Sequence, residues 1–346
     1  MPDIPIYNIY YLLCYAWNKL AERDMVDVES TPSTDLVNLF AKVLINGTRI
    51  LLKRGLDRGY CNRMEWKTRL SGRIAFGAAA NGDVHTKGML PCVYDEMSYN
   101  ILHNRILKTT IATLIATKGI DRRNANDLIG ILRHMMGIDT IRVTEKLFGD
   151  VRLNRNNHFY EFLMCICEIV HRNLLITEDS GKYVFRDFLR DEQQMRYLFE
   201  SFVKNFYRKH ASDKYSKIGG EQILWRLTSL SKDSERLLPT MNTDITLKSD
   251  NKIVVIDCKY TPSLFQEHHK VSFRSEHLYQ IFAYLNNLPR EILETKDEVI
   301  AFLLYPAVAK EHSHWFYDPK GRKVGVQTIN LAQPWPQIHE DLLALV

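Results

Sequence analysis

The strongest constraint on the fold of this chain is a pair of short apolar runs within residues 241–260, which read MNTDITLKSDNKIVVIDCKY. A polar turn at residues 249–251 separates the runs, and this pattern predicts two adjacent strands. Residues 253–256 are continuously apolar, which is typical of a strand covered on both faces. This apolar strand ends in an aspartate and a lysine two residues apart, Asp257 and Lys259.

Alternation along a strand places Asp257 and Lys259 on one face and points Cys258 into the core on the other. If the two runs pair antiparallel, Asp244 reaches the same face as Asp257. Two carboxylates and an ammonium group would then converge, which is costly unless a divalent cation neutralises the carboxylates. Oxygen ligands of this kind suit Mg²⁺ shared with substrate phosphates, and Lys259 could orient a water molecule or stabilise developing charge.

This arrangement matches the D-(x)n-[DE]-x-K pattern of PD-(D/E)xK nucleases. The chain holds other [DE]-x-K triplets in turns or polar sequence, whereas Asp257-Cys258-Lys259 alone follows a β-branched run and a second strand with its own aspartate. The alternative interpretation is a surface hairpin whose aspartate and lysine form an ordinary ion pair.

Further candidate residues flank the two runs. Glu200 lies in a predicted amphipathic helix and is a candidate third metal-binding carboxylate, with a solvated surface glutamate as the equal alternative. Gln280 and Tyr284 form a QxxxY motif on one helical face, which resembles the motif of RecB-like nucleases whose residues line the site and contact DNA. Lys209 belongs to a basic and aromatic segment suited to DNA phosphates, with a solvated helix end as an at least equal alternative. Lys270 belongs to a predicted flexible, basic loop near the DNA path, which we favour over metal binding by residues 267–270.

The whole chain is predicted to be a mixed α/β protein of more than one domain. It has 346 residues and a mildly basic net charge of +5, which favours a polyanionic partner without requiring one. We expect an N-terminal α+β domain over residues 1–150, a helical connector over residues 151–190 and a compact α/β domain over residues 191–346. Six scattered cysteines without metal-site spacing predict a reduced, cytoplasmic protein, and no apolar window is long enough to predict a membrane span.

Several longer stretches resemble the McrC family, the nuclease subunits of McrBC modification-dependent restriction systems. They are NIYYLLCYAW, SGRIAF, LLPTMNTDI, IVVIDCKY and LYQIFAYL. The resemblance implies a C-terminal PD-(D/E)xK, restriction-endonuclease-like domain with a central mixed sheet flanked by helices. It also implies Mg²⁺-dependent cleavage of double-stranded DNA carrying methylated cytosine, with Asp244, Asp257 and Lys259 as the catalytic residues.

The same resemblance implies a partner, a McrB-like AAA+ ring whose GTPase the N-terminal part stimulates. The chain contains no G-x-x-x-x-G-K-[ST] loop, so we expect it to bind no nucleotide itself. We expect the ring-contacting element in a projecting, glycine-containing hairpin at about residues 63–97. The alternatives are an adaptor that activates the ring without cutting DNA, and a nuclease that acts alone.

Overall fold

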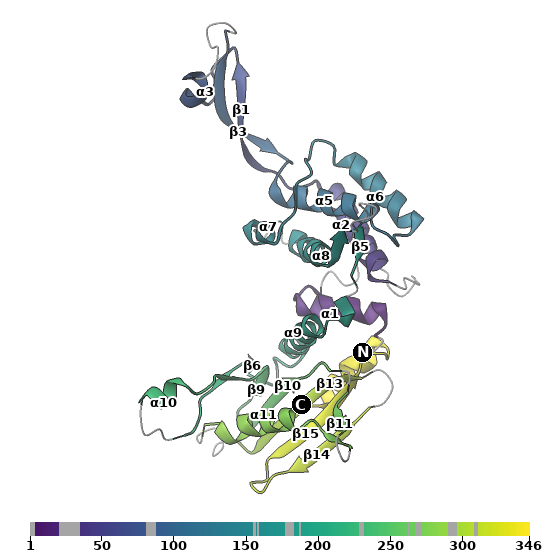
Figure 1. Ribbon diagram of the computed structural model, residues 1–346, viewed down its shortest axis with the longest axis vertical. Helices are drawn as coiled ribbons and strands as arrows, with labels where there is room; N and C mark the ends of the chain where they lie inside the picture. The colour runs from purple at the N-terminus through teal and green to yellow at the C-terminus, as the bar shows by residue number, and fades with distance from the viewer. Residues whose placement is uncertain are drawn as a thin grey trace. The chain divides into compact units, whose positions relative to one another are not determined.

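The computed structural model describes residues 4–20, 35–80, 88–154, 157, 159–176, 183–186, 188–227, 232–261, 263–267, 271–289, 296–307 and 311–346. The chain forms two compact units (Figure 1). The first, here the sheet unit, combines Met1–Arg23 with Asp187–Val346, and the second, here the middle unit, is Asp24–Arg186. This division differs from the expected domains, because the first helix joins the C-terminal part and most of the expected connector joins the middle unit.

The first helix belongs to the sheet unit because its aromatic side chains pack there. Helix α1 (Ile6–Ala16) lies against α9 (Glu192–His210). The Tyr15 ring meets the Phe202 ring edge-on at 5.7 Å, and the Tyr15 hydroxyl lies 2.8 Å from His210 Nε2. These contacts span nearly 200 residues of sequence, so no local pattern predicts them.

The sheet unit is built on a six-stranded mixed sheet with the order β14-β15-β13-β10-β9-β6. The central strands β10, β13 and β15 are parallel, and antiparallel strands complete both edges. The bounds of these strands are β6 Lys217–Gly219, β9 Ile245–Lys248, β10 Lys252–Cys258, β13 Glu298–Ala307, β14 Ser313–Tyr317 and β15 Lys323–Asn330. The two predicted neighbouring strands and the turn between them are therefore confirmed.

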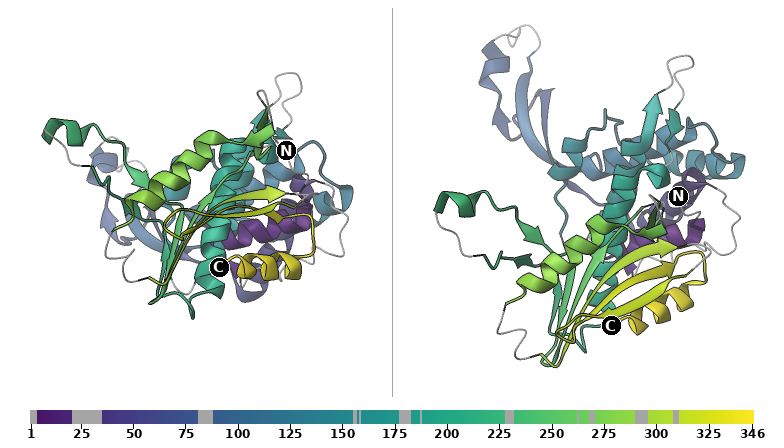
Figure 2. Two further views of the ribbon diagram at one scale, coloured as in Figure 1. Left: turned by 90° about the horizontal axis from the view of Figure 1, so that it is seen from below. Right: turned by 60° about the horizontal axis from the view of Figure 1, so that its bottom comes forward.

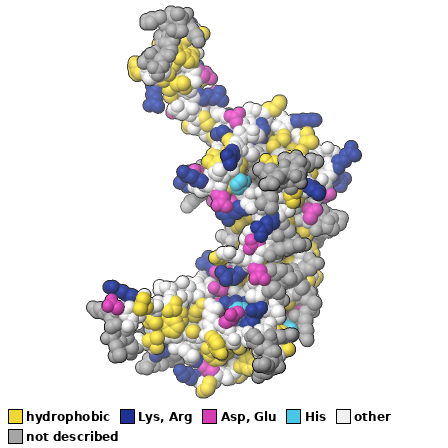
Figure 3. Space-filling model, viewed as in Figure 1, with side chains coloured by type: hydrophobic (Ala, Val, Ile, Leu, Met, Phe, Trp, Pro, Cys, Tyr) yellow, Lys and Arg dark blue, Asp and Glu magenta, His cyan; other side chains and the backbone are white. Residues whose placement is uncertain are grey.

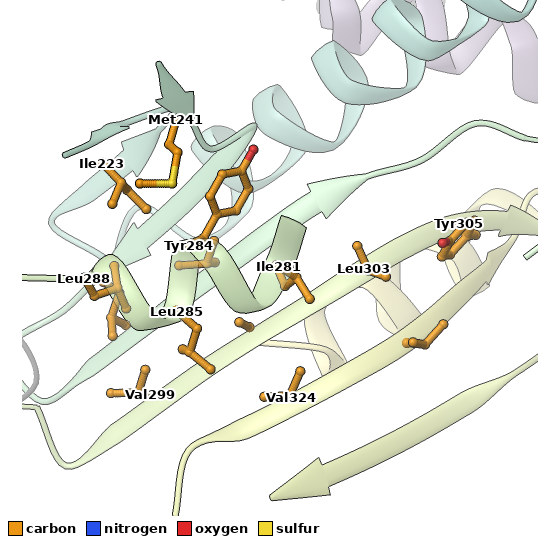
Figure 4. Close-up of a cluster of buried hydrophobic side chains, with 14 residues drawn as sticks. Ile223, Met241, Ile281, Tyr284, Leu285, Leu288, Val299, Leu303, Tyr305 and Val324 are labelled. Atoms are coloured by element: carbon orange, nitrogen blue, oxygen red, sulfur yellow. The ribbon is translucent and has the colours of Figure 1, made fainter. Parts of the chain in front are cut away.

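Helices cover both faces of this sheet, which explains the unbroken apolar sequence of β10. Ile253 and Val255 belong to a buried cluster with Ile281, Tyr284 and Leu285 of α11 (Ser275–Asn287) (Figure 4). Helices α1, α9 and α13 (Trp335–Ala344) lie on the opposite face (Figure 2). On that side the Tyr207 hydroxyl donates a hydrogen bond to the carbonyl of Leu342 at 2.8 Å, which ties α9 to α13.

Shorter elements complete the sheet unit. They are η2 Phe188–Arg190, β7 Gln222–Ile223, α10 Lys232–Arg236, β8 Met241–Asn242, β11 Phe265–Glu267 and β12 Val271–Phe273. Strands β7 and β8 pair with each other, as do β11 and β12. Thr243 and Asp244 separate β8 from β9, so the first predicted strand is interrupted at its aspartate.

The middle unit contains a group of helices and a small sheet that extends from it. The helices are α2 Leu36–Arg54, α5 Leu102–Ile115, α6 Arg122–His134, α7 Glu145–Asp150 and α8 Phe159–Asn173, with a short ribbon of β4 Leu174–Ile176 and β5 Tyr183–Phe185. Helix α2 is bounded at both ends by local signals in the sequence. It begins where the Asp35 carboxylate accepts the amide proton of Asn38 at 2.9 Å and ends at Gly55, which has a φ of 89°.

The extending sheet has the order β1-β3-β2 and falls in the predicted hairpin stretch. Its elements are β1 Gly59–Lys67, β2 Arg73–Ile74, α3 Phe76–Ala80 and β3 Leu90–Ser98. Gly72 has a φ of 75°, and a Cβ there would lie 2.3 Å from the carbonyl oxygen of Val93. Only glycine fits this close approach. Residues 81–87, which belong to the predicted hairpin stretch, lie outside the described part of the chain.

Candidate functional site

The candidate site lies at one end of the sheet, where β9 begins and β10 ends. Ile245 of β9 pairs with Ile256 of β10, so the next step of the antiparallel register places Asp244 opposite Asp257. On the other side of β10, Asp257 pairs with the buried residue Leu303 of β13. Alternation then puts both aspartates on one face of the sheet, as the sequence predicted, and the structure shows that α11 covers this face.

The Asp244 side chain is fixed against the neighbouring strand. Its Oδ2 atom accepts a hydrogen bond from the backbone N–H of Cys258 at 2.8 Å. The contact uses one carboxylate oxygen and leaves the other available. Cys258 itself is buried, and strand alternation points its side chain away from the face that carries Asp257 and Lys259, as expected.

Asp257 is fully buried, with a relative exposure of 0%. Its Oδ2 atom lies 2.7 Å from Lys259 Nζ. Apart from this ion pair, neither carboxylate oxygen has a hydrogen-bond partner among the described residues. A buried carboxylate with so few partners is costly unless something else compensates its charge.

Lys259 is held in place by a line of hydrogen bonds from α11. Its ammonium group donates to Gln280 Oε1 at 2.7 Å, and Gln280 Nε2 donates to the Tyr284 hydroxyl at 2.6 Å. The Tyr284 hydroxyl in turn donates to the backbone carbonyl of Asn242 at 2.7 Å. Figure 4 shows the Tyr284 ring extending from α11 towards Met241, beside Asn242 at the end of β8. The QxxxY motif therefore connects α11 to the lysine.

The surroundings of Asp244 and Asp257 disfavour a negative charge on both carboxylates at once. Burial, followed by the charges of Asp257 and Glu200, raises the pKa of Asp244 to about 7 against weaker opposing effects of the Cys258 amide and Lys259. Burial also raises the pKa of Asp257, and Lys259 opposes that shift. Two carboxylates in this environment favour a shared proton or a bound cation.

Glu200 is close enough to affect both aspartates but is engaged elsewhere. Its Oε1 atom lies 3.2 Å from Lys204 Nζ, one helical turn along α9. Within the described ranges, no three Asp, Glu, His or Cys side chains converge tightly enough to enclose a metal ion by themselves. Mg²⁺ needs only one or two protein carboxylates, because waters and substrate phosphates complete its octahedral shell. Asp244 and Asp257 fit that requirement, since each presents an oxygen without a hydrogen bond from the described residues.

The structure does not place every predicted DNA-binding residue at this site. Lys209 follows Glu200 by nine residues, and about 100° per residue puts it about half a turn around α9, on the opposite side. Lys270 lies outside the described residues. Tyr284 is only 4% exposed, so its buried ring faces protein, in contrast to the predicted DNA contact.

Two residues near the site were not singled out from the sequence. His277 lies three residues before Gln280 on α11, and its Nδ1 atom is 2.7 Å from the hydroxyl of Tyr305. Burial and the nearby Lys259 charge lower the pKa of His277 to about 4, so the imidazole is neutral at physiological pH. The sequence signal that could have identified His277 as a neighbour of the site is its i, i+3 spacing from Gln280, which places both residues on one side of the helix.

The fold and the site define an α/β protein with a paired-carboxylate and lysine cluster at the end of a mixed sheet. A family model described as McrBC 5-methylcytosine restriction system component matches residues 7–306. The chain therefore belongs to the McrBC 5-methylcytosine restriction system component family.

Individual relatives agree with this assignment. The chain is 32% identical over 343 residues to the type IV methyl-directed restriction enzyme EcoKMcrBC of Escherichia coli (strain K12), covering 99% of this chain and 97% of the relative. Its fold is similar to a chain in a solved half-complex of Thermococcus gammatolerans McrB AAA+ hexamers with bound McrC. That similarity has a TM-score of 0.57 at 14% identity and covers 99% of this chain and 76% of the other. None of the described helices is both long and apolar enough to cross a membrane.

Proposed function

We propose that this chain is the DNA-cutting subunit of a modification-dependent restriction complex, and that its sheet unit is a PD-(D/E)xK nuclease domain. The observation that carries the proposal is the buried Asp257 carboxylate, which lies opposite Asp244 and 2.7 Å from Lys259. A buried acidic pair beside an amine is unfavourable on its own but suits hydrolysis of a phosphodiester. The family description and the methyl-directed relative support DNA carrying 5-methylcytosine as the substrate class.

In this proposal Asp244 and Asp257 hold a Mg²⁺ ion, and Glu200 adds negative charge from α9. Bound Mg²⁺ supplies Lewis-acid polarisation of the scissile phosphate and acidification of a bound water. The Asp244 hydrogen bond to the Cys258 amide keeps its free oxygen directed at the shared site. Lys259 directs its ammonium towards the reacting phosphate, where it orients the attacking water and stabilises developing negative charge.

The partner in this proposal is an AAA+ ring that hydrolyses GTP. Support comes from the solved assembly that contains a chain of similar fold and is described as McrB AAA+ hexamers with bound McrC. We assign ring contact to the extending sheet of the middle unit, because its strands leave several large apolar side chains exposed. None of the described cysteines forms a disulfide bond, in keeping with a reducing cytoplasm, where such a complex would meet foreign DNA.

A cleavage assay with purified components tests the proposal. The full chain should cut methylated, but not unmethylated, double-stranded DNA when the ring partner, GTP and Mg²⁺ are all present. Asp257→Asn and Lys259→Ala should each abolish cleavage while ring binding and GTPase stimulation persist. Stimulation without any cleavage by the unaltered chain would instead show a non-cutting adaptor. Cleavage by Asp257→Asn at the normal rate would disprove the site assignment.

A further inference from the structure

Helix α9 packs against the end of β10 that carries the candidate site. The centre of the Phe199 ring lies 6.3 Å from the centre of the Tyr260 ring, and Tyr260 directly follows Lys259 in the sequence. Both rings are buried, so their contact fixes this part of α9 against the end of the strand. The neighbours of Phe199 on α9 are therefore placed beside the site.

Arg196 lies on the same side of α9 as these neighbours. It precedes Phe199 by three residues and Glu200 by four, and both spacings place side chains on one side of a helix. Burial raises the pKa of Asp257, and the charge of Arg196 is among those that lower it. The guanidinium is therefore close enough for its charge to act on the carboxylate at the site.

The hydrogen-bond donors of Arg196 are unused. The residue is exposed, and within the described ranges its guanidinium has no ion pair and no hydrogen bond. Its Cζ atom lies 5.4 Å from the centre of the Tyr197 ring, which is itself 54% exposed. Contact with a ring face uses none of the five N–H groups of a guanidinium. All of them remain available to a ligand.

Two other cations of this region already have partners. Lys259 pairs with Asp257 and donates to Gln280, and Lys204 pairs with Glu200. Figure 3 shows Lys and Arg side chains beside Asp and Glu side chains on the surface around α9. Arg196 differs from Lys259 and Lys204, because no described carboxylate pairs with it.

An exposed guanidinium with unused donors is suited to a phosphate. Arginine remains protonated at physiological pH, and its planar fork can donate to two oxygens of one phosphate. The charges of Lys259 and Glu200 affect the pKa of Asp257 more strongly than the charge of Arg196 does. The guanidinium is therefore farther from the carboxylate than they are, which suits a phosphate beside the reacting one.

We propose that Arg196 binds a DNA phosphate next to the scissile phosphate and so positions the strand at the site. This inference rests on the proposed function, which supplies DNA as the ligand. Two N–H groups of Arg196 donate to the non-bridging oxygens of that phosphate, while the Tyr197 ring supports the guanidinium. The contact is the same in the ground state and the transition state, so it contributes to binding and not to the rate of the chemical step.

Substitutions that remove or keep the charge test this contact in the complete complex. Arg196→Gln removes the charge, and Arg196→Lys keeps it without the fork. The matched control is Lys209→Gln, which removes an exposed cation from the opposite side of the same helix. KM and kcat for cleavage of methylated DNA are measured with the ring partner, GTP and Mg²⁺ at about 50 mM and about 200 mM salt. Thermal melting verifies folding.

Arg196→Gln should raise KM about tenfold at the lower salt concentration and leave kcat within about twofold. Losing one phosphate contact lowers the slope of log affinity against log salt by about 0.9, so the KM ratio of variant to unaltered chain should shrink about 3.5-fold at the higher concentration. Arg196→Lys should raise KM about threefold at both concentrations, because it keeps the charge. Lys209→Gln should keep KM within about twofold of the unaltered value.

An unchanged KM in Arg196→Gln, or an equal increase in Lys209→Gln, overturns the inference. A loss of kcat at constant KM also overturns it, because Arg196 would then act on the scissile phosphate itself. A KM ratio that does not depend on salt would show a structural role of the side chain in place of a phosphate contact. If the unaltered complex does not cut DNA, the proposed function is wrong, and this outcome is distinct from a failure confined to the Arg196 variants.

Discussion

Lys259 Nζ donates a hydrogen bond to Gln280 Oε1 at 2.7 Å, and the geometry around Gln280 leaves its amide only one orientation. The carbonyl of Asn242 can only accept, so the single proton of the Tyr284 hydroxyl is used in the bond to it. Tyr284 must then accept from Gln280, which turns Nε2 towards the tyrosine and Oε1 towards the lysine. The motif thus positions Lys259 through a directional sequence of hydrogen bonds.

Gln280→Leu should lower kcat for DNA cleavage by about 10- to 100-fold, a cost typical of losing a residue that orients a functional group. The KM for DNA should change little, because the lysine is misdirected while the DNA contacts remain. Tyr284→Phe should have a smaller effect, about tenfold, since Gln280 keeps its contact but loses its fixed direction. Steady-state cleavage kinetics with the complete complex measure both values.

The exposed residue Tyr279, on the same helix, provides the control for this prediction. Its side chain is 73% exposed, and Tyr279→Phe should leave kcat unchanged. An increase in KM at constant kcat for Gln280→Leu would instead favour the DNA-contacting role that the QxxxY pattern first indicated.

The stability of the metal-free chain should depend on pH through Asp244. Its pKa is raised to about 7 when folded, against an ordinary aspartate value near 4, so the folded state keeps a proton that the unfolded state releases between these values. The free energy of unfolding should therefore fall as pH rises from about 4 to about 7, by at most a few kcal/mol. His277 contributes in the opposite sense, because burial and Lys259 lower its pKa from about 6.5 to about 4. Its contribution to the free energy of unfolding therefore rises as pH increases between these two values.

Asp244→Asn isolates the aspartate contribution from that of the histidine. Asparagine keeps an oxygen to accept the Cys258 amide proton but cannot ionise. In EDTA, denaturant unfolding should show that the variant gains stability relative to the unaltered chain as pH rises from 4.5 to 7.5. Parallel stability curves for the two proteins would contradict the raised pKa.

Mg²⁺ should stabilise the sheet unit independently of any DNA cleavage. A ligand that binds only the folded state adds about 2.7 kcal/mol at a concentration 100 times its Kd. Asp257→Asn should weaken Mg²⁺ binding by at least tenfold and remove this stabilisation, which thermal melting with and without Mg²⁺ measures. Glu221→Gln is the control, because Glu221 is paired with Lys217 and Lys248 instead. An equal Mg²⁺ effect in Asp257→Asn and the unaltered chain would exclude that residue as a ligand.

The convergence of Asp244, Asp257 and Lys259 was predictable because it depends on local sequence alone. A three-residue turn fixes the antiparallel register, and strand alternation then fixes the face. The engagement of Glu200 with Lys204 was equally local, since the i, i+4 spacing indicates it. These features need no knowledge of distant parts of the chain.

The role of the QxxxY motif and the position of the first helix were not predictable in this way. Tyr284 meets Asn242 across 42 residues, and Tyr15 meets His210 across 195. Both contacts depend on how a helix is seated on the sheet or on another helix, and periodicity says only which helical face is apolar. The role of the buried Tyr284 hydroxyl therefore depends on its acceptor, the Asn242 carbonyl, which the sequence alone does not identify.

The position of α11, and with it Gln280, should depend on a buried ion pair outside the site. Asp318 and Arg322 are 5% and 7% exposed, with 2.5 Å between Asp318 Oδ2 and Arg322 Nη2. Arg322 also donates from Nη1 to the carbonyl of Leu285 at 2.7 Å and from Nη2 to Asn286 Oδ1 at 2.8 Å, which fixes the end of α11. Removing one partner of such a pair leaves an uncompensated buried charge.

Asp318→Ala should therefore lower the free energy of unfolding by about 3–5 kcal/mol, as measured by denaturant titration. The matched control is Asp233→Ala, which removes an ion pair with Arg236 whose side chains are 93% and 82% exposed and should cost under about 1 kcal/mol. At temperatures where Asp318→Ala remains folded, its cleavage rate should be reduced, as in Gln280→Leu. The reason is that the loosened helix no longer directs Gln280 at Lys259. Full cleavage activity in a destabilised Asp318→Ala would show that α11 keeps its place without the Asp318–Arg322 ion pair.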